Sequence, residues 1–275
     1  MAARVARTGY DEGMNGAGSP SAMAAPRTVG VVFEGCACRS AFAAGVGAEL
    51  TRAGVPISIV AGASSGSIIA AGMAAGLGPD LPALWEQVGG RSIVSLRRMA
   101  YNRSPFDLST IVHDAVRSAI GDGNLRGHPI EALCTVTRLR DLRTLVLSSR
   151  DEPDFALAVL GSCFFPVFYG RTVRLRGELV VDGGATDNLP VPALAARGAD
   201  LIFAVVPAAD GTAFRRLFAP RVRPEALAPA GVRVIAIHPR KPLAIGSWDL
   251  DRDRMRAAVA AGREAAARAL DGLTI

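Results

Sequence analysis

Short apolar runs rich in β-branched residues recur along the chain, and most are followed by a turn and a segment with helical periodicity. Runs of this kind predict buried strands, and the periodic segments between them predict helices. Strands are expected at residues 29–33, 57–61, 132–137, 144–148, 178–181, 201–206 and 232–237. Helices are expected at residues 41–53, 65–76, 81–88, 108–120, 155–160, 190–197 and 249–270.

The repeated order of strand, tight turn and helix is typical of an α/β protein whose strands run parallel. We therefore expect a three-layer α/β/α sandwich with a mostly parallel central sheet. Residues 79–128 break the alternation because they are rich in arginine and turn residues, which indicates a helical insertion over one edge of the sheet. Residues 1–27 are rich in Gly, Ser, Ala and Pro and predict a disordered leader rather than a signal peptide. Residues 28–275 then form a single domain.

Composition narrows the class of protein. The 275 residues are 50% hydrophobic and 20% charged, which excludes a disordered chain and allows a large core. No apolar run reaches the roughly 18 residues that a membrane-spanning helix needs. The four cysteines are too few for a disulfide scaffold, so we expect a protein of a reducing compartment, the cytoplasm.

The net charge of +6 suits an anionic partner. The basic residues are almost all arginine, with Lys241 as the only lysine, and they are scattered along the chain. Nucleic-acid binding is not expected, because its footprint is a clustered basic stripe. Peripheral contact with anionic lipid head groups fits better. Two segments, residues 85–106 and 214–218, combine arginines with large apolar side chains as interfacial surfaces do.

Residues 62–66, Gly-Ala-Ser-Ser-Gly, match the G-x-S-x-G pattern of a nucleophile elbow. A predicted strand precedes them and a predicted helix follows, which is the context that this pattern requires. Gly62 and Gly66 leave room for an abrupt turn, and Ser64 would present its hydroxyl at the positive end of the helix. A small-residue connection between any strand and helix gives the same letters, so the motif needs support from elsewhere in the chain.

Two further segments supply that support. Asp182 ends a predicted strand and is followed by Gly183 and Gly184, which places a carboxylate at the edge where parallel sheets carry their sites. An ordinary Asp-Gly turn is the alternative there. Residues 34–40 join the first strand to a helix, so their backbone amides can point at an anion, as acyl transfer requires for its oxyanion.

Taken in this order, the three segments resemble those of the patatin-like phospholipases. The resemblance extends to residues 41–46, after the loop, and to residues 161–169, before the strand that ends at Asp182. It is strongest at residues 182–190, Asp-Gly-Gly-Ala-Thr-Asp-Asn-Leu-Pro, and covers about residues 29–270. Each motif alone is weak, whereas the ordered set is specific.

The resemblance implies a lipid acyl hydrolase with a Ser–Asp dyad and no catalytic histidine. Ser64 would attack an ester carbonyl to give an acyl-enzyme, and Asp182 would accept the serine proton and return it to the leaving alcohol. Burial would have to raise the basicity of Asp182, since an aspartate has a pKa of about 4 in water. The backbone amides implied for the oxyanion hole are those of Gly35, Cys36, Ala37, Arg39 and Ser65.

The resemblance implies no cofactor. Cys36 and Cys38 stand at C-x-C spacing, which can hold a metal ion. No other cluster of cysteine and histidine supplies the remaining ligands, so no zinc or other metal is expected.

The glycine-rich loop departs from the family's pattern. The family usually carries G-G-G-x-[RK]-G, whereas this chain keeps Gly35 and the basic Arg39 but has Cys36, Ala37 and Ser40 at the other places. If Ala37 or Ser40 needs a positive φ, roughly 1–2 kcal/mol of strain follows. Backbone amides are present whatever the side chain, so the departure implies altered activity rather than none.

Two other functions stay open. The order Ser64, Asp182, His238 matches the triad order of the α/β-hydrolases, but that fold places several strands before its elbow and only one precedes the elbow strand here. His238 also directly follows the apolar run 232–237, where a histidine at a strand end is unremarkable. A catalytically silent lipid-binding or scaffolding protein would account for the altered glycine loop.

Overall fold

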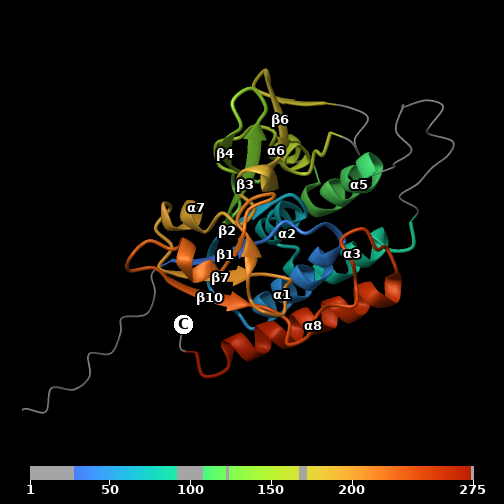
Figure 1. The fold of residues 1–275 in the computed structure, drawn as a ribbon, viewed down its shortest axis with the longest axis vertical. Helices are drawn as coiled ribbons and strands as arrows, with labels where there is room; N and C mark the ends of the chain where they lie inside the picture. Colours follow the sequence, from blue (N-terminus) through green and yellow to red (C-terminus); the bar gives the residue numbers. More distant parts are fainter. Residues whose placement is uncertain (1–27, 92–107, 122–123, 167–171, 274–275) are drawn as a thin grey trace, which may run out of the picture.

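The computed structural model describes residues 28–91, 108–121, 124–166 and 172–273, which Figure 1 draws in colour. The predicted leader and residues 92–107 of the predicted insertion lie outside the described part. Within the described ranges, no helix is both long enough and apolar enough to cross a membrane.

An eight-stranded sheet forms the centre of the molecule (Figure 1). Its strands are β1 (Val29–Phe33), β2 (Ile57–Ala63), β3 (Glu131–Arg138), β4 (Arg143–Ser148), β5 (Val173–Leu175), β6 (Glu178–Asp182), β7 (Leu201–Val205) and β10 (Arg233–Ile237). The strand order is β10-β7-β1-β2-β3-β6-β5, with β4 also paired to β3. Five neighbouring strands run parallel: β10, β7, β1, β2 and β3. Strands β4 and β6 run antiparallel to β3, and β5 runs antiparallel to β6. The predicted mostly parallel sheet is confirmed.

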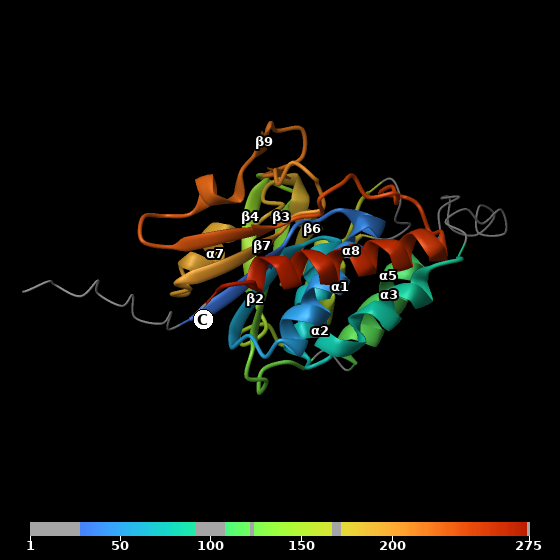
Figure 2. The same cartoon turned by 90° about the horizontal axis from the view of Figure 1, so that it is seen from below.

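Helices cover both faces of this sheet (Figures 1 and 2). They are α1 (Ser40–Arg52), α2 (Ser65–Ala74), α3 (Leu81–Val88), α5 (Leu108–Ile120), α6 (Phe155–Ser162), α7 (Val191–Ala195) and α8 (Arg252–Leu270). On β1, Val31 and Phe33 point into a large core under α1, α2 and α8, while Val32 points into a smaller core under α7. The pleat of the strand sends neighbouring side chains to opposite faces. The predicted three-layer α/β/α sandwich is confirmed.

The long strands and helices lie where the apolar pattern predicted them, with ends shifted by a few residues. The shortest elements carried no readable pattern and were not predicted. They are β5, β8 (Ala213–Phe214), β9 (Arg221–Val222) and the 3-10 helices η1 (Ala37–Arg39), η2 (Gly78–Asp80), η3 (Gly183–Ala185) and η4 (Pro224–Leu227). Elements of two to four residues are shorter than the periods that reveal strands and helices in a sequence.

The described helices of the predicted insertion do not cover an edge of the sheet. Helix α3 packs against α1 and α8, and α5 packs against α2 and α6 (Figure 1). Both helices therefore belong to the helical layer that covers the larger core. Apolar side chains at helical spacing drive this packing, with Trp85 of α3 and Val116 of α5 buried in the larger core. Both helices lie where the sequence predicted them, but their expected position over an edge of the sheet was wrong, because their apolar faces pack against other helices.

Strand β3 brings two distant parts of the chain together. Strand β4 pairs along one side of β3, so β2 and β6 share the other side. On that side Ala63, at the end of β2, lies opposite Thr135, and Asp182, at the end of β6, lies opposite Val136. The two strands run in opposite directions, so their carboxyl ends meet head to head. We expected Asp182 at the end of a parallel strand, whereas it arrives on an antiparallel one.

Candidate active site

Ser64 stands in the turn between β2 and α2, with φ 51° and ψ −133°. Such a backbone conformation is strained for a residue with a side chain. Two glycines make the turn possible, because a Cβ on Gly62 would lie 2.3 Å from the carbonyl carbon of Gly66. A Cβ on Gly66 would in turn lie 2.4 Å from the last carbonyl oxygen of β1. The geometry is that of the predicted elbow.

Hydrogen bonds on both sides hold the strained serine. The Ser64 amide donates to Ser162 Oγ at 2.8 Å. The Ser64 carbonyl accepts from Ser67 Oγ at 2.6 Å and from the Ser67 amide at 2.9 Å. The backbone of Ser64 is therefore fixed, and its hydroxyl is left to the pocket.

The Asp182 carboxyl meets Ser64 from the end of β6. Its Oδ1 accepts a hydrogen bond from the Gly184 amide at 2.7 Å, and the Ser64 side chain lies at the same pocket. Interactions with Ser64 and with the Gly184 amide lower the pKa of Asp182, but desolvation outweighs them and raises the pKa to about 6. Within the described residues, no cation contributes to this balance. Gly183, which lies between Asp182 and Gly184, packs directly against the backbone of Thr135 on β3.

Three of the five amides predicted for the oxyanion hole already have acceptors. The pairs are Gly35 N–H with the Asn188 carbonyl (3.3 Å), Cys36 N–H with Ser65 Oγ (3.1 Å) and Arg39 N–H with the Cys36 carbonyl (3.3 Å). The amides of Ala37 and Ser65 have no acceptor among the described residues, and both residues line the pocket. These two N–H groups are the ones free to receive a ligand oxygen.

The two unusual positions of the glycine-rich loop differ in conformation. Ala37 has a φ of 53°, a conformation that favours glycine. Ser40 has a φ of −66° and begins α1 without strain. Its hydroxyl hydrogen-bonds Ser65 Oγ at 2.7 Å and Cys36 Sγ at 3.2 Å. The strain of roughly 1–2 kcal/mol expected for a positive φ therefore applies to Ala37 alone.

Asn188 joins the Asp182 segment to the glycine-rich loop. Its Nδ2 donates to the Gly35 carbonyl at 3.0 Å, while its own carbonyl accepts from the Gly35 amide. A bond from Thr135 Oγ1 to the Asp187 carbonyl at 2.9 Å fixes the same segment to β3. Asn188 and Ser162 were not predicted as site residues, and their only signal in the sequence was that they lie in stretches that resemble the family.

Glu34, directly before this loop, is a second buried carboxyl. Desolvation raises its pKa to about 7, although nearby Arg221 and Arg39 lower it. Its Oε1 accepts from the Phe214 amide at 2.8 Å, and its Oε2 has no hydrogen-bond partner among the described residues.

A pocket of about 90 Å³ opens beside Ser64 and Asp182. Its walls are apolar side chains from α2, α3, α5 and the segment after β10: Ile68, Trp85, Val88, Ile111, Val112, Ala115, Trp248 and Leu250. Trp85 also donates from Nε1 to the Cys38 carbonyl at 3.4 Å, which joins the insertion to the glycine-rich loop. The pocket thus combines a serine, an aspartate and two unpaired amides with walls that suit an apolar ligand.

Residues 31–195 match the family model described as "Patatin-like phospholipase". The chain belongs to the patatin-like phospholipase family. The matched residues include the glycine-rich loop, the elbow and Asp182, so the resemblance predicted from the sequence is confirmed.

Curated relatives of this patatin-like protein match over shorter ranges. "Lysophospholipase nte1" of Aspergillus oryzae is 30% identical over 186 residues, which make up 65% of this chain and 12% of that protein. "1-acylglycerol-3-phosphate O-acyltransferase Pnpla3" of Mus musculus is 30% identical over 88 residues, 31% of this chain and 21% of that protein. The chain therefore spans only a small part of the length of either relative.

A solved structure shares the fold. The crystal structure of VipD from Legionella pneumophila aligns with 90% of this chain and 67% of that chain, at a TM-score of 0.53 and 15% identity. This likeness supports the patatin-like arrangement of the three layers.

Neither a histidine nor a metal cluster joins Ser64 and Asp182 in the described part of this patatin-like protein. His238 directly follows β10, where its Nδ1 lies 3.2 Å from the Pro239 carbonyl, and it does not line the pocket. Burial raises the pKa of both Cys36 and Cys38 to about 12, which keeps these thiols neutral. No group of three or more His, Cys, Asp or Glu side chains in the described residues is arranged to hold a metal ion.

Proposed function

We propose that this patatin-like protein hydrolyses carboxylic esters of lipids through an acyl-serine intermediate. The observation that carries the proposal is the meeting of Ser64 and Asp182 at one pocket, where the ends of β2 and β6 converge on β3 and where desolvation raises the pKa of the carboxyl. A carboxylate in that setting binds a proton more readily than an ordinary aspartate does, and a base for serine needs this property. The lysophospholipase name of its relative supports the same class of reaction.

The first half of the reaction forms the acyl-enzyme. Asp182 takes the proton of the Ser64 hydroxyl as Oγ attacks the ester carbonyl carbon, and the carbonyl oxygen becomes an oxyanion. The free amides of Ala37 and Ser65, which line the pocket, would donate to that oxyanion. When the tetrahedral intermediate collapses, the carbon–oxygen bond to the alcohol breaks, and Asp182 returns the proton to the leaving alcohol.

The second half repeats the first with water. Asp182 takes a proton from water as it attacks the acyl carbonyl carbon, and the bond to Ser64 Oγ then breaks with return of that proton to the serine. A free carboxylic acid leaves and the enzyme is restored. The apolar walls of the pocket suit the acyl chain, so we propose lysophospholipids and other monoacyl esters as the first substrates to test.

The altered loop favours one competing function, a silent lipid-binding protein. Ala37 holds a strained conformation within the proposed oxyanion hole, and a displaced amide there would remove much of the rate acceleration. The two functions differ in the reactivity of Ser64, which a covalent probe reports directly.

The test is labelling with a fluorophosphonate together with hydrolysis of lysophosphatidylcholine. We expect wild-type protein to be labelled at Ser64 and to release fatty acid, Ser64→Ala to do neither, and His238→Ala to retain both within about threefold. A folded wild-type protein that is not labelled would support the silent function, and loss of hydrolysis in His238→Ala would support a triad.

A further inference from the structure

The chain between β7 and β10 carries the short β8–β9 hairpin, which projects from the body of the molecule (Figure 2). We name residues 213–223 the docking segment. Phe218 in this segment is 95% exposed, and Phe214 and Leu217 are 42% and 43% exposed. Phe218 also has a φ of 60°, an unfavourable conformation for a bulky residue. An aromatic side chain that is strained and nearly fully exposed contributes little to the fold, which indicates an external partner.

The charge of the docking segment identifies the kind of partner. Arg215 and Arg216 are exposed, and neither forms an ion pair within 4.0 Å among the described residues, although the charge of Arg215 lowers the pKa of Asp187. Arg221 lies over the Phe214 ring at 4.4 Å, and Arg223 is exposed. Exposed apolar side chains among exposed arginines match the boundary of an anionic bilayer, which offers acyl chains below and negative head groups above.

The docking segment is bonded to both loops of the candidate active site. The Phe214 amide donates to Glu34 Oε1 at 2.8 Å, directly before the glycine-rich loop. The Leu217 amide donates to the Gly184 carbonyl at 2.8 Å, two residues after Asp182. The carbonyl of Arg215 accepts from the Asn188 amide at 2.7 Å. A membrane or other surface that binds the docking segment would therefore lie close to the loops that carry Ser64 and Asp182.

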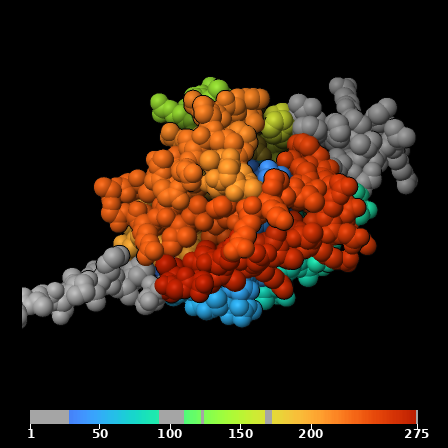
Figure 3. All heavy atoms as spheres, turned by 60° about the horizontal axis from the view of Figure 1, so that its bottom comes forward, coloured from blue at the N-terminus to red at the C-terminus, as the bar shows by residue number. Residues whose placement is uncertain are grey.

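We propose that the docking segment binds the surface of anionic lipid bilayers, with Leu217 and Phe218 at the acyl boundary and Arg215 and Arg216 at the head groups. The inference deepens the proposed function, because it states where a lipid hydrolase meets its substrate. The part of the chain after β7, drawn in orange, lies on the face of the molecule shown in Figure 3. The binding itself needs no hydrolysis and is measured separately.

The experiment is co-sedimentation with vesicles of phosphatidylcholine alone and of phosphatidylcholine mixed with phosphatidylglycerol, in a Ser64→Ala background that leaves the lipid intact. We expect binding to the mixed vesicles that weakens in high salt. R215E/R216E should weaken it by at least roughly 20-fold, since each arginine near an anionic surface contributes a factor of about five. L217S/F218S should weaken it by about tenfold through loss of apolar contact.

The matched control is R233E/R263E, which changes the net charge equally at exposed arginines outside the docking segment. We expect it to keep binding within about threefold. Equal loss in this control would overturn the proposal in favour of unspecific attraction. Unchanged binding in both docking-segment variants would also overturn it, as would absence of binding to anionic vesicles by folded protein, which would point to a protein partner. Failure of lipid hydrolysis alone leaves each of these results intact.

Discussion

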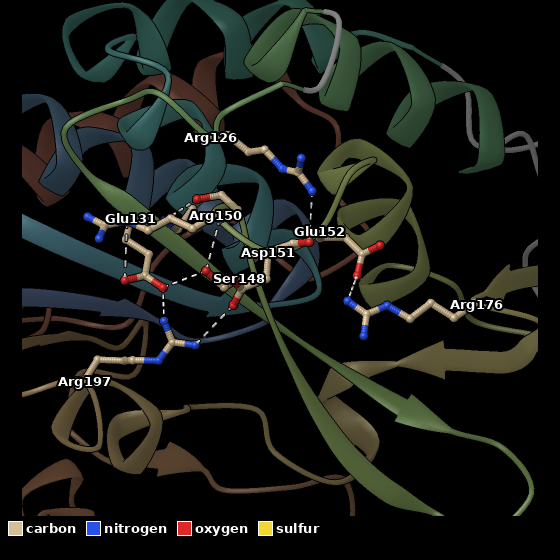
Figure 4. A network of polar contacts seen from close by, with 10 residues as sticks. Arg126, Glu131, Ser148, Arg150, Asp151, Glu152, Arg176 and Arg197 are labelled. Carbon is tan, nitrogen blue, oxygen red and sulfur yellow. Dashed lines mark hydrogen bonds and ion pairs between the residues drawn. The ribbon is translucent and has the colours of Figure 1, made fainter.

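Two carboxyl groups at opposite ends of β3 have different surroundings. At its start, Glu131 accepts from Ser148 Oγ at 2.6 Å and forms an ion pair with Arg197, while Arg150 lies at 3.8 Å (Figure 4). Near its end, the neighbouring Asp182 accepts from the Gly184 amide and has no arginine partner among the described residues. The charge of one acid is balanced by arginines, whereas the other is desolvated without a compensating cation.

This difference separates a structural acid from a chemical one. A buried carboxylate that is paired with arginines joins elements of the fold, and removal of one partner leaves an uncompensated charge. A carboxylate that is desolvated without a cation destabilises the fold and keeps a high affinity for protons. The contrast predicts that substitutions at the two positions affect activity and stability in opposite directions.

The largest expected effect is on activity. Asp182→Asn should lower kcat for lysophosphatidylcholine by roughly 10³-fold, because the base is lost while the shape is kept. The matched control is Asp187→Asn, five residues further on, where burial also raises the pKa to about 6 but the side chain does not line the pocket. We expect the control to keep kcat within about threefold. Equal losses of kcat in the two variants, measured in a steady-state assay, would show that Asp182 is not the base.

The second effect is the dependence of rate on pH. Only the ionised form of Asp182 can accept a proton, and the pKa of this group is about 6. We therefore expect kcat/KM to fall about tenfold per pH unit below pH 6 and to level off above pH 7. The measurement is a pH profile in buffers of constant ionic strength. A profile that levels off already at pH 4 would show that desolvation does not act on this carboxyl in solution.

The third effect concerns stability, with opposite signs at the two acids. Glu131→Gln should lower the free energy of unfolding by about 2 kcal/mol, less than for a fully buried pair because Arg197 is 39% exposed. Asp182→Asn should raise it by about 1–3 kcal/mol at pH 8, since the native pKa of Asp182 lies above its ordinary value.

The linkage sign fixes the pH range of this gain. A raised native pKa means that the folded state holds the proton more tightly, so wild-type stability falls as pH rises from about 4 to 6. The advantage of Asp182→Asn should therefore vanish below about pH 4. Urea unfolding at pH 4 and pH 8 checks both signs, and a variant that is equally stabilised at both pH values would contradict the desolvation argument.

The smallest effect tests the strain in the glycine-rich loop. Ala37→Gly should stabilise the protein by about 1 kcal/mol, because glycine adopts the φ of 53° without penalty. The control Ala53→Gly, at a φ of −74°, should destabilise it by about 0.5–1 kcal/mol. Thermal unfolding of both variants measures the difference, and a destabilised Ala37→Gly would show that the alanine is not strained.

The sequence predicted the turn at Ser64 and the carboxylate at Asp182, but it did not predict the strand pairing that brings them together. The apolar runs predicted the layers, and the glycines at positions 62 and 66 predicted the turn at Ser64. The convergence with Asp182 depends on β6 running antiparallel along β3, and no local pattern in residues 178–182 records that register. Strand direction depends on long-range pairing, so it is visible only once β2, β3 and β6 are placed together.

Side-chain orientation explains the other gaps. The Cys36 amide was expected to face an oxyanion, but the Ser65 hydroxyl accepts its hydrogen bond. The conditional expectation of strain was confirmed at Ala37 and not at Ser40. The sequence of a loop shows which backbone amides are available. Which acceptors pair with these amides depends on the side-chain rotamers of residues on other elements.

The head-to-head meeting of β2 and β6 on one strand has a consequence for how such a protein can change. Insertion or deletion of one residue in β6 would turn Asp182 to the opposite face of the sheet, because side chains alternate along a strand. Only length changes of two residues keep the facing direction, and these shift the carboxyl by about 7 Å. The number of residues in β6 therefore determines whether the carboxyl reaches the pocket at the end of β2.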